Sequence, residues 1–174
     1  SLDANGSVGF YMDSTLETFA EDFSAALRGE AIENNLPRLR AIIDSTSGNR
    51  YTTDPAMNEL LIANTHQYAP SKYHLRRGEK NTNQQSSGLI FSTWLGQGAW
   101  FAHGLDSATL DEIRSEIIEG QEESHYFVLA RDLNHRQRVD ERWSWVDWTD
   151  DITQILSDMH LSLIHISEPT RQLC

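Results

Sequence analysis

The strongest constraint on the fold is a pattern in residues 89–158, where two apolar and aromatic runs followed by a stretch of helical spacing occur twice. Gly96-Gln97-Gly98 joins the first two runs and is typical of a hairpin turn. The expected elements are, in order, strands at 89–95 and 99–105, a helix at 107–119, strands at 125–131 and 139–146, and a helix that begins near residue 150. We therefore predict an α+β fold whose C-terminal part, residues 89–160, is an antiparallel four-stranded ββαββα unit.

The first 66 residues carry helix signals instead. Ser14-Thr15-Leu16-Glu17 has the form of a capping box, in which a hydroxyl and a carboxylate each accept a hydrogen bond from a free backbone N–H group. Pro37 and Asp54-Pro55 are typical of the starts of two further helices. We interpret residues 1–66 as a mostly helical N-terminal part, or as the end of a preceding domain. Residues 67–88 lack apolar periodicity, which predicts a long polar loop.

Residues 161–171, Leu-Ser-Leu-Ile-His-Ile-Ser-Glu-Pro-Thr-Arg, match the in-frame translation of a transposase-type sequencing adapter at all eleven positions. Such scars are set aside before the fold is considered. We expect residues 161–174 to be a translated adapter. The His-x-Ser tripeptides that begin at His160 and His165 take their serines from this tail, so their likeness to two-histidine phosphoesterases predicts no site.

Composition narrows the classes of protein to which the chain can belong. A net charge of −12 keeps a protein in solution and argues against a surface that binds polyanions as a whole. Residues 1–160 contain no apolar run as long as a membrane span, so we expect no membrane association. Cys174 is the only cysteine and lies in the tail, which excludes disulfides and cysteine-based zinc sites from residues 1–160 and favours the cytoplasm. No cofactor and no metal site are predicted.

Two basic segments are candidate contacts for a macromolecule. Residues 72–80 are rich in basic side chains, with Tyr68 and Tyr73 interleaved, and arginines recur in residues 131–142. Both features are ingredients of a nucleic-acid contact. The alternative is that both segments are solvated loops that offset nearby acids. Trp148 is the tryptophan that we expect to be most exposed. The predicted binding residues are Tyr73, Arg76, Arg77, Arg136, Arg138 and Trp148.

Catalytic signals are weaker. His103 and His125 fall on predicted strands, and with Asp132 nearby they form a candidate set for general acid–base chemistry. No phosphate-binding glycine loop or nucleophile elbow is present. The leading prediction is therefore a non-enzymatic binding module that recognises another macromolecule, protein or otherwise. The alternatives are a phosphodiesterase-like hydrolase, which uses these three residues, and nucleic-acid binding through the basic segments. The sequence alone does not decide whether the protein is an enzyme.

Overall fold

The computed structural model divides the chain into two compact units, Ser1–Leu36 and Pro37–Cys174. For residues 161–166 it describes the path of the backbone. The residues that it describes are 14–31, 36–66, 68–98, 100–133, 141–157 and 161–166.

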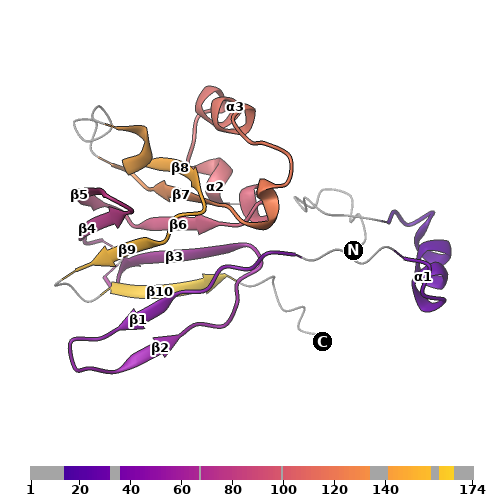
Figure 1. The fold of residues 1–174 in the computed structure, drawn as a ribbon, viewed down its shortest axis with the longest axis horizontal. Helices are drawn as coiled ribbons and strands as arrows, with labels where there is room; N and C mark the ends of the chain where they lie inside the picture. Colours follow the sequence, from indigo (N-terminus) through magenta and orange to yellow (C-terminus); the bar gives the residue numbers. More distant parts are fainter. Residues whose placement is uncertain are drawn as a thin grey trace. The chain divides into compact units, whose positions relative to one another are not determined.

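The first unit contains the helix α1 (Phe19–Leu27), labelled in Figure 1. Its N-cap is Thr18, whose hydroxyl bonds to Thr15 and does not cap the helix, so the predicted capping box at Ser14 to Glu17 is wrong. Phe19 and Phe23 stack with their ring centroids 5.6 Å apart. The apolar residues Phe19, Phe23 and Leu27 of the helix are nevertheless exposed, as is Leu16 before it.

The second unit is built from antiparallel strands in three sheets, and Figure 1 labels them. The two-stranded sheet pairs β1 (Ile42–Asp44) with β2 (Arg50–Thr52). The five-stranded sheet has the order β10 (Leu161–Ile166), β3 (Glu59–Asn64), β6 (Leu89–Ser92), β7 (Tyr126–Ala130) and β8 (Val146–Thr149). The three-stranded sheet has the order β5 (Lys80–Ser86), β4 (Ser71–Arg77) and β9 (Thr153–Leu156).

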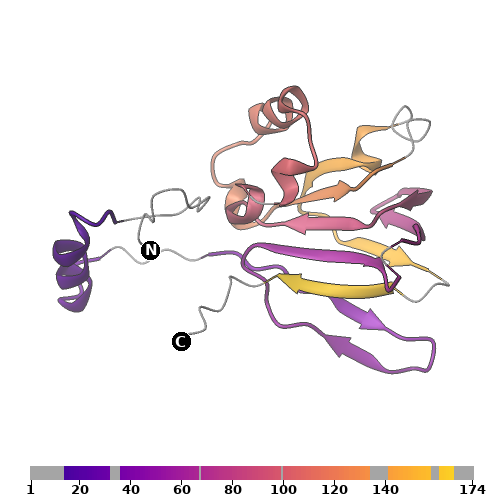
Figure 2. The same ribbon diagram turned by 180° about the vertical axis from the view of Figure 1, so that it is seen from behind.

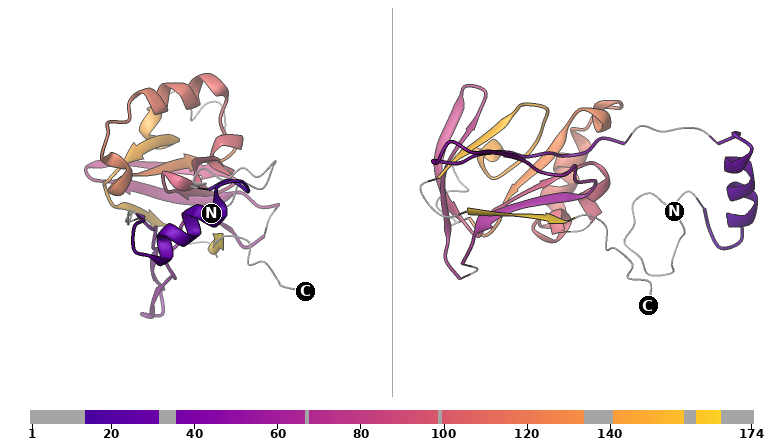
Figure 3. Two further views of the ribbon diagram at one scale, coloured as in Figure 1. Left: turned by 90° about the vertical axis from the view of Figure 1, so that its right-hand side faces the viewer. Right: turned by 90° about the horizontal axis from the view of Figure 1, so that it is seen from below.

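Few helices accompany these strands. The α-helices of the second unit are α2 (Trp100–His103) and α3 (Ser107–Ser115), and the 3-10 turns are η1 (Leu95–Gly98), η2 (Gln121–Glu123) and η3 (Arg142–Ser144). Figure 1 and Figure 2 show α2 and α3 on one side of β6, β7 and β8, and the end-on view in Figure 3 agrees. Within the described residues, no helix is long and apolar enough to cross a membrane.

The five-stranded sheet separates two apolar cores, because successive residues of a strand point to opposite faces. On one face Leu60, Leu89 and Phe91 pack against Tyr73 and Leu75 of the three-stranded sheet. The opposite face packs against the helices. Its buried residues are Leu61, Ile90, Phe101, Ile113, Phe127, Leu129 and Val146.

These observations confirm an α+β protein with antiparallel sheets, but the arrangement differs from the predicted ββαββα unit. Residues 100–103 form a helix where a strand was predicted, and residues 153–156 form a strand where a helix was predicted. Of the predicted strand 139–146, residues 139–140 lie outside the described part, residues 142–144 form η3, and Val146 begins β8. The two helices predicted after Pro37 and Asp54 are instead strands. Short apolar runs have the same appearance in a buried strand and in a helix, which explains these errors.

The predicted polar loop at 67–88 is also wrong, since β4 and β5 form a hairpin there. On β4 the residues Tyr73, Leu75 and Arg77 are buried, while Lys72 and Arg76 are exposed. Burial therefore alternates along the strand with a period of two residues. It is hidden in the sequence because several inward positions are polar. Gly78 in the turn has φ +56°, a conformation that glycine adopts without strain.

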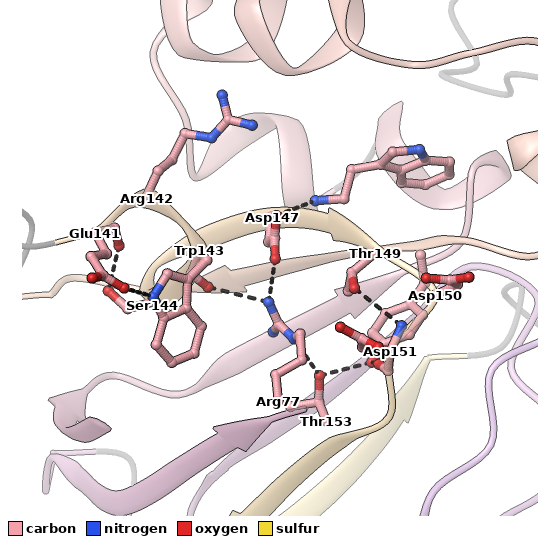
Figure 4. Close-up of polar contacts among 12 residues, drawn as sticks. Arg77, Glu141, Arg142, Trp143, Ser144, Asp147, Thr149, Asp150, Asp151 and Thr153 are labelled. Carbon is pink, nitrogen blue, oxygen red and sulfur yellow. Dashed lines mark hydrogen bonds and ion pairs between the residues drawn. The ribbon is translucent and has the colours of Figure 1, made fainter. Parts of the chain in front are cut away.

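Arg77 joins the three-stranded sheet to the five-stranded sheet (Figure 4). Arg77 is 3% exposed, and its guanidinium lies 2.5 Å from the carboxylate of Asp147 on β8. The same group donates to the backbone oxygen of Trp143 at 3.2 Å and to the hydroxyl of Thr153 at 3.0 Å. A buried charge needs partners of this kind, so the packing of the two sheets depends on this contact.

Arg76 and Arg77 form a matched pair for mutation, since they are neighbours on β4 with opposite exposure. We expect Arg77→Ala to lower the free energy of unfolding by ~3 kcal/mol, because the carboxylate of Asp147 loses its cation. Arg76→Ala removes an exposed charge and should change this free energy by less than ~0.5 kcal/mol. Urea unfolding followed by circular dichroism measures both values, and equal losses in the two variants would contradict the assigned role of Arg77.

Candidate functional site

The candidate site lies where β3 begins and β6 ends. These strands are antiparallel, and their register places Glu59 opposite Ser92. The chain then leaves β6 through Thr93 and Trp94 into η1 and α2. We call residues 93–98 and 100–103 the post-β6 segment. It is irregular, and much of it is held against the sheet by polar contacts.

Thr93 fixes the start of the post-β6 segment. Its backbone N–H donates to the oxygen of Asn58 at 2.9 Å, and its hydroxyl donates to the oxygen of Met57 at 2.5 Å. The N–H of Gly96 then returns to Thr93, 3.1 Å from both its backbone oxygen and its hydroxyl. Gly96 is pressed so closely on the start of β3 that a Cβ atom there would overlap the oxygen of Asn58 and the hydroxyl of Ser92. A glycine is therefore required at this close approach.

Glu59 fixes the end of the same segment. It is 1% exposed, and its carboxylate accepts the backbone N–H of Phe101 at 2.8 Å. Burial raises the pKa of Glu59, while the backbone N–H groups of Phe101 and Trp100 and the charge of His103 act in the opposite direction. The carboxylate thus satisfies backbone donors in the first turn of α2, which have no partner inside so short a helix.

Gln97 links the segment to α3. Its side chain is fully buried, and the amide nitrogen donates to the backbone oxygen of Trp94 at 3.0 Å. The amide oxygen accepts from Nε of Arg114 on α3 at 2.9 Å. Because both ends of this amide are used, Gln97 holds η1 and α3 together from inside the protein.

An aromatic cluster supports the segment from the sheet side. Phe127 on β7 lies 4.5 Å from Phe101, 6.2 Å from Trp94 and 4.3 Å from Trp148, measured between ring centroids. Trp100 belongs to the same segment but is 45% exposed. A rigid, polar-anchored backbone therefore presents an indole ring to solvent, and such a ring can stack on a planar ligand.

The residues predicted for catalysis lie in different surroundings. His103 ends α2, and its charge acts on the carboxylate of Glu59. The ring of His125 stacks on Trp148 at 5.5 Å and lies 4.0 Å from a carboxylate oxygen of Asp150, an exposed residue. Asp132 follows β7 in a turn with φ 49°. Within the described residues, no group of three or more potential metal ligands is found.

The predicted binding residues are also dispersed. Tyr73 is buried, and burial raises the pKa of its hydroxyl to about 12 although Ser86 bonds to it. Arg77 is buried against Asp147, whereas Arg76 is exposed on the same strand. Arg136 and Arg138 lie outside the described residues. The structure therefore places one buried arginine and one exposed arginine in the first basic segment, which is a hairpin.

The expectation that Trp148 would be the most exposed tryptophan is wrong. Trp148 is half-buried, with its indole N–H donating to Gln121 at 2.9 Å and its ring packed on Trp94 and Phe127. Trp100, which was not predicted as a site residue, is the more exposed ring. Glu59, Thr93 and Gln97 were missed as well. One feature of the sequence could have pointed to Glu59, because this acid directly precedes the apolar run that ends at Ile62. An acid at the start of a buried strand needs hydrogen-bond donors from elsewhere in the fold.

No protein-family model and no curated protein matches the chain. Several solved structures resemble its fold, and two of them are kinases. Yeast NADH kinase complexed with NADH matches 91% of this chain with a TM-score of 0.58 and 14% identity. An NAD kinase from Archaeoglobus fulgidus in complex with ATP matches 92% of this chain with a TM-score of 0.51 and 14% identity. The chain spans 48% and 58% of the length of these two proteins.

This likeness shows a shared fold, and it corrects the leading functional prediction. A non-enzymatic binding module was predicted because no catalytic motif was found in the sequence. The two proteins named above are kinases, and this finding contradicts the prediction of a non-enzymatic binding module. A motif search fails here because the residues of the candidate site come from two segments more than thirty positions apart, around Glu59 and Thr93.

The charge on Glu59 has a testable consequence for stability. Burial raises the pKa of Glu59 in the folded chain above its ordinary value of 4.5, so the folded state binds this proton more tightly than the unfolded state does. The stability contributed by this group is therefore present below pH 4.5 and is lost as the pH rises through the folded pKa.

Glu59→Gln removes this titration. We expect the unfolding free energy of Glu59→Gln, minus that of the unchanged chain, to become more positive between about pH 4 and about pH 8. Urea titrations at several pH values measure it, with Glu79→Gln in the exposed β4–β5 turn as the control for loss of one charge. A difference that stays constant or falls with pH would show that the pKa of Glu59 is not raised in the folded chain.

Proposed function

We propose that this chain is the nucleotide-binding part of a phosphoryl-transfer enzyme that resembles the NAD(H) kinases. Its ligand would be a dinucleotide of the NAD or NADH class, and the reaction served would be transfer of a phosphoryl group to that dinucleotide. The support comes from the fold shared with two such kinases over more than nine tenths of this chain. Since the chain spans about half of their length, binding is the appropriate step to test.

The observation that carries the proposal is the post-β6 segment. Its backbone is held from three sides, by Glu59, by the backbone of residues 57–58 and by Gln97. Binding sites are commonly irregular segments positioned by a rigid scaffold, because a preformed geometry reduces the entropy lost on binding.

Two features of the segment suit a dinucleotide. The exposed indole of Trp100 offers a flat surface on which an adenine or nicotinamide ring can stack. Gly98, at the end of η1, has no Cβ atom, so a ligand could approach the backbone closely there. The role of Glu59 is positioning, because its carboxylate is buried and already accepts a hydrogen bond from α2.

Isothermal titration of the chain with NADH, NAD and ATP tests the proposal. We expect saturable binding of NADH or NAD, and a loss of affinity of about tenfold or more in Trp100→Ala, because stacking of a base on an aromatic ring is worth ~1–3 kcal/mol. Tyr51→Ala is the matched control, since Tyr51 is an exposed aromatic residue on β2. Absence of binding by the folded chain, or equal losses in both variants, would contradict this assignment.

A further inference from the structure

The strand β5 ends the three-stranded sheet, where it pairs with β4 on one side (Figure 1). It is as long as β4, and its register runs from Lys80 to Ser86 without a bulge. Within the described part of the chain, residues 80–86 form no backbone hydrogen bonds except those of the ladder with β4. An unpaired edge of this length is a template on which another strand can pair.

The turn before β5 determines which residues face this edge. Gly78 and Glu79 form a two-residue loop between Arg77 and Lys80. Residues that flank such a loop exchange both backbone hydrogen bonds, so alternate residues from Lys80 onward direct their N–H and C=O groups to β4. The residues between them direct these groups away from the sheet. They are Asn81, Asn83 and Gln85, and their side chains are also exposed.

The composition of β5 leaves the edge unprotected. Natural edge strands are commonly blocked by charged side chains, by proline or by a bulge. Lys80 is the one charged residue of β5 and stands at its first position, and the six residues that follow are uncharged and include no proline. In a chain with 26 acidic and 14 basic residues, such a strand suits a partner strand that is uncharged as well.

Gln84 gives a second, independent indication of a partner. Its side chain is 6% exposed, and its amide nitrogen donates to the backbone oxygen of Ser144. Its amide oxygen is buried and accepts no hydrogen bond from the described residues. A buried acceptor without a donor is destabilising. Because Gln84 belongs to the outermost strand, a strand added at this edge would place a side chain directly beside it.

We propose that the outer edge of β5 is a self-association site, at which β5 of a second copy of this chain pairs antiparallel across a two-fold axis. The register that overlaps all seven residues places Asn83 opposite itself and Asn81 opposite Gln85. Both contacts join amide side chains, which donate and accept at once. Thr82 lies opposite Gln84, so its hydroxyl donates to the unpartnered amide oxygen, and the symmetry provides this contact twice.

The charges around the edge are compatible with a second copy. On the outer face of the sheet the charged residues are Lys72 and Arg76, which lie on β4, one strand away from the edge. In the dimer, three inter-strand spacings of ~4.8 Å would separate these cations from those of the other copy, which exceeds the screening length of ~8 Å at physiological ionic strength. Local repulsion between the two copies is therefore weak.

Sedimentation velocity of the 174-residue chain over a range of concentrations tests the proposal, and we expect a monomer–dimer equilibrium. Asn83→Lys should raise the dissociation constant about tenfold or more, because two lysines then face each other on the axis. Gln154→Lys is the matched control, since Gln154 is exposed on the same face of the opposite edge strand, β9, and gains the same charge. It should change the dissociation constant by less than about twofold.

Two further variants test the register. Thr82→Val keeps the shape of the side chain but removes the hydroxyl, so it should raise the dissociation constant about tenfold, because both copies of Gln84 lose their donor. In a chain that carries Cys174→Ser, Asn83→Cys should form a disulfide between the two copies on mild oxidation, since directly paired residues of neighbouring strands lie within disulfide reach. Gln154→Cys in the same background should not.

Three results would overturn the proposal. The first is a chain that stays monomeric at every concentration, even if a strand of another protein then occupies the edge. The second is a dimer that Asn83→Lys and Gln154→Lys weaken equally, with both variants shown to be folded by circular dichroism. The third is a dimer in which Asn83→Cys forms no cross-link and Thr82→Val has no effect, because the strands would then not pair in this register.

Discussion

A carboxylate buried at the start of a strand needs hydrogen-bond donors, and Glu59 finds them in the backbone of α2. That contact joins β3 to the segment that follows β6, although the two are separated along the chain. Thr93 and Gln97 complete the attachment at the start and the middle of the segment. The result is an irregular backbone with little freedom, which is the property required of a preformed binding site.

Much of the α+β class could be predicted from the sequence, but less of its arrangement. The apolar runs that form β6 and β7 were found because they are long and rich in branched and aromatic residues. β4 and β5 were missed because their inward positions include Arg77, Gln84 and Ser86, which are buried with polar partners. A polar residue satisfied by its neighbours has no signature in a hydrophobicity pattern.

The candidate site could not be predicted from local sequence patterns for a related reason. Glu59 has a distinctive environment only once Phe101 is folded against it, forty-two positions along the chain. His103, by contrast, was singled out for its chemical type, and its position beside Glu59 emerged from the fold. The fold shared with two NAD(H) kinases supports the dinucleotide-binding role that we propose for this arrangement.

The account rests on Trp100 as the ring that a dinucleotide contacts, and the five tryptophans of the chain allow a direct measurement. Their indole N–H groups give separate signals in a ¹H–¹⁵N correlation spectrum of the labelled protein. On titration with NADH, the signal of Trp100 should move most, and that of Trp143, which packs near Arg77, should stay in place. A spectrum in which no indole signal moves, or in which Trp143 moves and Trp100 does not, would contradict the central claim.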